Sequence, residues 1–89
     1  MKGSHLYERM VNVPRVDTAA ATFHVLHNAQ DFPAPVQLTA SAIFFTLLCE
    51  RHGVSVQDAM TVAKNLINTH DGTLATEFEA IRLYLKEEQ

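Results

Sequence analysis

Two histidines stand three residues apart in the segment 22–31, TFHVLHNAQD, where a pair of imidazoles could bind a metal ion. On a helix, His24 and His27 would project from one side, and Asp31 could supply a third ligand. A closed metal site needs about four ligands, and the His-Glu-x-x-His pattern of metalloproteases is absent. Two histidines at the border of a helix are the favoured interpretation, so we expect no metal site and no cofactor.

The single cysteine, Cys49, could act as a nucleophile only as a thiolate. It falls in the last turn of an expected helix, where the helix dipole disfavours an anion. His52 follows three residues later, but nothing nearby suggests an oxyanion hole. The sequence also contains no Gly-rich phosphate loop. We therefore expect a packing role for Cys49, no catalytic residues, and a protein that is not an enzyme.

The segment 48–64 allows a comparison with the helix-turn-helix of DNA-binding proteins. Gly53 would occupy the turn, and His52 stands where that motif has an apolar residue. Small or apolar residues fit the other packing positions: Cys49, Val54, Ala59 and Val62.

In such a motif, the side chains facing the DNA groove would be Gln57, Thr61 and Lys64. Lys64 is the only cation among them, and the whole chain has a net charge of −3 from seven Lys/Arg and ten Asp/Glu. Because affinity for DNA depends on phosphate contacts, this charge argues against nucleic acid as a partner. An αα-hairpin without DNA affinity is the favoured interpretation, and a DNA-binding regulator is the alternative.

Helices must position these residues, because apolar residues recur at helical spacing along nearly the whole chain. With 89 residues, 47% hydrophobic and 19% charged, the sequence predicts a single globular domain over residues 1–89. We expect an all-α fold of four helices with a short N-terminal extended arm over residues 1–16. The valines around Pro14 predict the extended conformation of that arm.

The expected helices span approximately residues 18–29, 39–52, 56–70 and 74–87. Their expected N-caps are Asp17, Thr39 and Ser55, whose side-chain oxygens can accept a hydrogen bond from a first-turn amide. Leu38 would pack on Ile43 as a hydrophobic staple. Gly53 is placed to end the second helix in the left-handed conformation.

The helix over 39–52 has two apolar faces, which makes it the expected central hub of the domain. The first face comprises Ala40, Ile43, Phe44, Leu47 and Leu48, and the second comprises Ala42, Phe45 and Cys49. A domain this small can hardly cover both faces by itself. We therefore expect a homodimer or larger homo-oligomer with Ala42, Phe45 and Cys49 at a subunit or partner interface.

The most apolar stretch, residues 40–49, is about half of the roughly 20 residues that a membrane span requires. The N-terminus shows no apolar run of signal-peptide length, and the one cysteine has no partner for a disulfide. These features predict a cytoplasmic protein without a membrane segment.

Three segments carry a resemblance across residues 11–85: the start VPRVD, the hinge FPAPVQ and the turn CERHGVS. In these, the chain resembles small proteins encoded by bacteriophage and prophage genomes. The resemblance implies a cytoplasmic accessory protein that binds a host protein. The expected function is that of a small non-catalytic helical protein-interaction module, and the alternative is a helix-turn-helix DNA-binding regulator.

Overall fold

The computed structural model describes residues 2–88, with side chains from residue 6 to residue 87, and it confirms the all-α class. Between these residues the only extended pairing is a single antiparallel bridge between Asn68 and Leu74. Residues 2–88 contain five helices where four were expected: α1 (Lys2–Val11), α2 (Arg15–Ala29), α3 (Ala34–His52), α4 (Val56–Ile67) and α5 (Thr76–Glu88).

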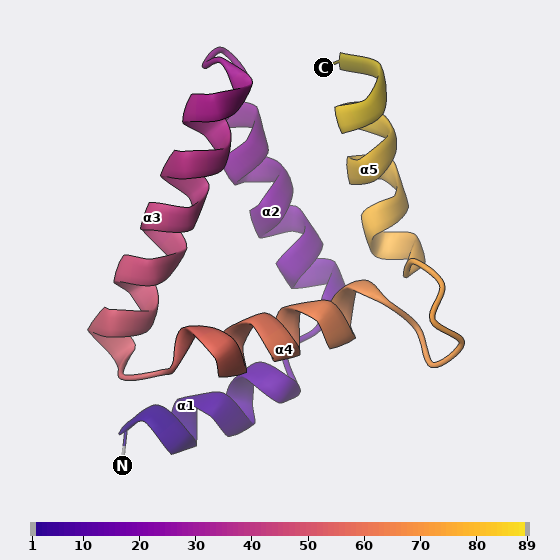
Figure 1. The fold of residues 1–89 in the computed structure, drawn as a ribbon. Coiled ribbons are helices and arrows are strands. Elements are labelled where there is room, and N and C mark those ends of the chain that lie inside the picture. Colours follow the sequence, from indigo (N-terminus) through magenta and orange to yellow (C-terminus); the bar gives the residue numbers. More distant parts are fainter. Residues whose placement is uncertain (1, 89) are drawn as a thin grey trace.

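The helices form an open triangle (Figure 1). α2 and α3 diverge from the turn that joins them, and α4 closes the base of the triangle. α1 packs on α4 and α3, while α5 packs on α2. The molecule measures 41 × 31 × 18 Å, and its thinnest dimension is less than twice the diameter of about 10–12 Å of one helix with its side chains.

The expected N-terminal extended arm is wrong, because residues 2–11 form α1. Leu6 and Met10, four residues apart, are half-buried and line a hollow together with residues of α4. Burial of this pair favours a helix over the extended form that the valines indicated. The chain is extended at Pro14, which has φ −66° and ψ 137° and separates α1 from α2.

The start of α2 also differs from expectation, since Pro14 and not Asp17 is its N-cap residue. Asp17 lies inside the first turn, where its charge complements the positive end of the helix dipole. The hydroxyl of Thr18 donates to the carbonyl of Pro14 at 3.0 Å.

α3 begins at Ala34, five residues before the expected cap Thr39. Pro33 is the N-cap residue, with φ −61° and ψ 155°, and a second proline lies in the first turn. Proline fits there because first-turn amides have no partner within the helix. Leu38 therefore lies inside the helix, where it is exposed. It does not occupy the position just before an N-cap that the expected hydrophobic staple with Ile43 requires.

The expected end of α3 and start of α4 are confirmed. Gly53 adopts φ 70°, and the amide of Val54 donates to the carbonyl of Cys49 at 3.0 Å. The Ser55 hydroxyl oxygen accepts a hydrogen bond from the amide of Asp58 at 3.0 Å. Together these contacts define a turn of three residues between the two helices.

α4 ends at Ile67, before the expected end at His70. The chain then forms a small hairpin in which Gly72 has φ 81° and the Ala75 amide donates to the Ile67 carbonyl at 2.7 Å. α5 therefore starts at Thr76, because Leu74 belongs to the bridge and not to the helix.

Arg15 connects the start of α2 to the end of α4. Its guanidinium donates to the carbonyls of Leu66 at 2.7 Å and Asn68 at 3.0 Å. These carbonyls lie at the negative end of the α4 dipole, where a cation is stabilising. Arg15 thereby holds one corner of the triangle.

Small side chains dominate the core. Ala19, Ala75 and Phe78 form a buried cluster between α2 and α5, against which Leu74 and Ile81 pack. Phe23 and Tyr84 make an edge-to-face contact between the same two helices, with ring centroids 5.7 Å apart, and Tyr84 donates a hydrogen bond to Gln30. Cys49, Ala59 and Val62 are the other buried residues, and they lie on α3 and α4.

Candidate interaction surface

The chain exposes more surface than its mass requires. A compact monomer of 9.9 kDa exposes about 5,200 Å². The observed surface is 6913 Å², a surplus of about 1,700 Å² over that scaling. The radius of gyration, 13.8 Å, likewise exceeds the value of about 12 Å for a compact chain of this length. Apolar side chains account for much of this surface, since fifteen large hydrophobic residues are exposed among those whose side chains the structure describes.

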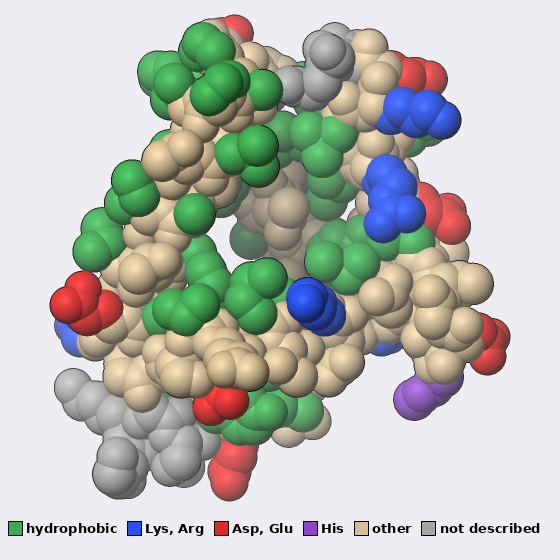
Figure 2. Space-filling model, in the orientation of Figure 1, with side chains coloured by type: hydrophobic (Ala, Val, Ile, Leu, Met, Phe, Trp, Pro, Cys, Tyr) green, Lys and Arg blue, Asp and Glu red, His purple; other side chains and the backbone are tan. Residues whose placement is uncertain are grey.

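Part of this surface is a hollow inside the triangle, with a volume of about 770 Å³ (Figure 2). All five helices contribute to its wall, and most of the lining side chains are apolar. Arg9 and Arg82 are its only lining residues that carry a full charge. Among the large apolar side chains around it are Met10, Phe45, Val62, Leu66, Phe78 and Ile81. An apolar hollow of this volume is large enough to hold side chains of another molecule.

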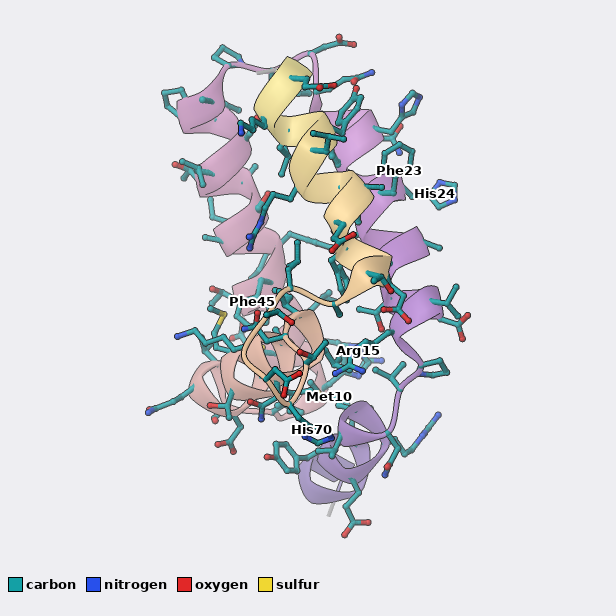
Figure 3. The ribbon with its side chains drawn as sticks, turned by 90° about the vertical axis from the view of Figure 1, so that its right-hand side faces the viewer. Met10, Arg15, Phe23, His24, Phe45 and His70 are labelled. Atoms are coloured by element: carbon teal, nitrogen blue, oxygen red, sulfur yellow. The ribbon has the colours of Figure 1, made fainter. Side chains whose placement is uncertain are left out.

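The two apolar faces of α3 have different environments. Cys49 is buried, with 7% of its surface exposed, and Phe45 lines the hollow, where Figure 3 shows it near the level of α4. Ala42 is exposed. Cys49, one of the three expected interface residues, is thus covered by the chain itself, because α4 packs on that side of α3.

The opposite face of α3 is uncovered. Val36 is 46% exposed, Ile43 55%, Phe44 54% and Leu47 56%. No charged residue occurs from position 32 to position 49. Surfaces that become buried in complexes lack charge at their centre in the same way.

Sequence reasoning missed Val36 as a member of this face, because the helix was expected to start at Thr39, three residues after Val36. The available signal was the spacing 36, 40, 43 and 47, which continues the apolar stripe through the first turn. Pro33 at the N-cap and Pro35 in the first turn concealed it, although a helix tolerates proline at its start.

The corner between α3 and α4 is compatible with a helix-turn-helix. Gly53 is in the left-handed conformation, and the packing residues Cys49, Ala59 and Val62 are buried. The three proposed reading residues, Gln57, Thr61 and Lys64, are all exposed on α4.

The histidine pair is not part of a larger ligand cluster. His24 and His27 are exposed, and Figure 3 shows His24 directed away from the other helices. Asp31 is exposed beyond the end of α2. Over the described part of the chain, no group of three His, Cys, Asp or Glu side chains is arranged to hold a metal ion. His52 is exposed while Cys49 is buried.

Within residues 2–88, no helix combines the length and the apolar character that crossing a bilayer requires. Comparisons with protein-family models, with curated proteins and with solved structures gave no match.

Proposed function

We propose that this chain is a small, non-catalytic protein-interaction module that acts as a homo-oligomer. The surplus of about 1,700 Å² of exposed surface, much of it apolar, is the observation that carries the proposal. A standard stable interface takes about 800 Å² from each partner, so this surplus exceeds what one such interface needs. In an oligomer, α3 would be covered on both sides and would serve as the central hub that its two apolar faces predict.

The experiment is a measurement of mass in solution by sedimentation equilibrium over a wide concentration range. We expect twice the chain mass of 9.9 kDa, or a larger multiple, at micromolar concentration. A single species of 9.9 kDa at every concentration would overturn the homo-oligomer. Urea unfolding at several protein concentrations gives an independent test, because the midpoint of an oligomer rises with concentration and that of a monomer does not.

The resemblance to bacteriophage proteins suggests a host protein as the further partner, bound in the cytoplasm. The apolar hollow supports this proposal, because its wall presents Phe45, Met10 and Leu66 to a ligand. A tagged chain should retain one host protein from lysate after nuclease treatment, and the two purified proteins should form a complex. Phe45→Asp should abolish that complex while Leu83→Asp, on the outer side of α5, should leave it intact. Equal binding by both variants would overturn the assignment of the hollow.

The alternative function is that of a DNA-binding regulator, favoured by the left-handed Gly53 and the exposed Gln57, Thr61 and Lys64. It predicts binding to duplex DNA that weakens steeply with salt and is lost on Lys64→Ala. The net charge of −3 opposes such binding. Absence of binding to any duplex at low salt would dismiss this alternative.

A further inference from the structure

The exposed face of α3 has the spacing of a coiled-coil seam. Val36, Ala40, Ile43 and Leu47 are separated by four, three and four residues, which is the alternation of a and d positions in a heptad. All four residues belong to α3, and all four are exposed. The seam is about 16 Å long, because each residue of a helix adds about 1.5 Å. A second helix could therefore pack along it over about three turns.

The spacing of the four seam residues is the same whether the helix is read forwards or backwards. The pairs 36 and 47, and 40 and 43, have the same midpoint in the sequence. A second α3 that runs antiparallel would place its Leu47 opposite Val36 and its Ile43 opposite Ala40. Each contact would then occur twice, as a two-fold dimer requires.

The surface relief fits the same pairing. A shallow depression lies around Ala40, bounded by Val36, Thr39 and Ile43. Ala40 is the smallest residue of the seam and leaves this space, while Ile43 beside it is 55% exposed. In the antiparallel arrangement the Ile43 side chain of the second copy would fill the depression at Ala40, as a knob fills a hole.

The charges at the two ends also favour the antiparallel direction. The first charged residue before the seam is Asp31, and the first after it are Glu50 and Arg51. Glu50 and Arg51 lie three and four residues after Leu47, so both continue the same side of the helix. An antiparallel copy would bring this oppositely charged pair toward Asp31, where Arg51 can offset the negative charges, whereas a parallel copy would place Asp31 beside its equivalent. Antiparallel helix dipoles add to this preference.

We infer that a second copy of this chain binds the exposed face of α3, with the two α3 helices antiparallel and Val36 of each facing Leu47 of the other. The inference rests on the proposed homo-oligomer and specifies its interface. The surplus surface of about 1,700 Å² belongs to the whole chain, hollow included, and the exposed face of α3 supplies part of it.

Cysteine pairing tests the arrangement. Two chains would be prepared, one with Val36→Cys and one with Leu47→Cys, both also carrying Cys49→Ala so that only the introduced thiol reacts. One chain carries a tag, so that mixed and identical pairs differ in mass. The probe is a short bifunctional maleimide, and Leu83→Cys on α5 is the control position.

We expect linked pairs only in the mixture of Val36→Cys and Leu47→Cys chains. Neither chain should link to itself, because equivalent positions would be about 16 Å apart along the seam. Self-linking of either chain would overturn the antiparallel direction. Absence of mixed pairs, in chains that retain the dimer mass and helical circular dichroism, would place the interface elsewhere and leave the proposed homo-oligomer intact. If the parent chain itself is monomeric, the proposed homo-oligomer is refuted, and not only the position of its interface.

Charge exchange gives a second test that needs no cysteine. Arg51→Asp should weaken self-association several-fold at low salt, because only carboxylates would then face Asp31, and the double variant that also carries Asp31→Arg should recover the parent affinity. If the double variant associates more weakly than Arg51→Asp alone, the pairing of Asp31 with the second copy's Arg51 is wrong.

Discussion

Truncation of Leu47 gives the most direct measure of the proposed interface. This side chain is 56% exposed in the single chain. Full burial of a leucine contributes about 1.5–3 kcal/mol, so covering the exposed part contributes about 1–1.5 kcal/mol. Each dimer contains two such side chains, and Leu47→Ala should therefore weaken dimerisation by about 2–3 kcal/mol. The dissociation constant should rise about 30- to 150-fold, since about 1.4 kcal/mol corresponds to a factor of ten.

The assay is sedimentation equilibrium of Leu47→Ala over a dilution series, and the matched control is Leu83→Ala. Leu83 is also a leucine on a helix and is 54% exposed, but it lies on α5. The control should dissociate like the parent chain, and both variants should lose similar stability as monomers. If the parent is a dimer and Leu47→Ala dissociates within twofold of it, or if Leu83→Ala weakens the dimer equally, Leu47 does not lie in the dimer interface.

Substitutions at three positions test the contacts that hold the helices in place, each measured by urea unfolding at fixed protein concentration. Gly53→Ala should lower the free energy of unfolding by about 1–2 kcal/mol through backbone strain alone, because φ is 70° and no atom lies within 4 Å of an added Cβ. An unchanged midpoint would contradict the left-handed turn. Arg15→Met should cost about 1.5–3 kcal/mol through loss of charged hydrogen bonds to the end of α4, with Arg15→Lys recovering part of the loss. Equal stability of Arg15→Met and the parent would contradict that cap. Ser55→Ala should cost about 1 kcal/mol and Ser55→Asp much less, and the reverse order would contradict the N-cap.

Local sequence signals predicted a helix end correctly where the residue at that end strongly favours a single backbone position. Gly53 and Ser55 belong to this group, because a left-handed position selects glycine and an N-cap selects a short side-chain oxygen. The prolines were less informative. Pro14, Pro33 and Pro35 mark breaks in a helix, but the same fixed φ also suits the start of the next helix. As a result, both α2 and α3 begin earlier than expected.

The N-terminal helix could not be predicted from its own residues. Its apolar pair, Leu6 and Met10, is stabilised in the structure by burial against α4, which lies far away in the sequence. A short helix is marginal in isolation and depends on such tertiary packing. The valines of residues 11–16, with their preference for extended structure, were the stronger local signal.

The sequence by itself determined that α3 has two apolar faces and no charge from position 32 to position 49, because helical periodicity and composition are local properties. Only the tertiary structure decided which face the chain covers. The direction of the three-residue turn that begins at Gly53 lays α4 against α3, where Cys49 becomes buried, and leaves Ile43 and Leu47 on the outside. Periodicity defines directions around one helix axis, whereas the position of a neighbouring helix depends on contacts between distant segments.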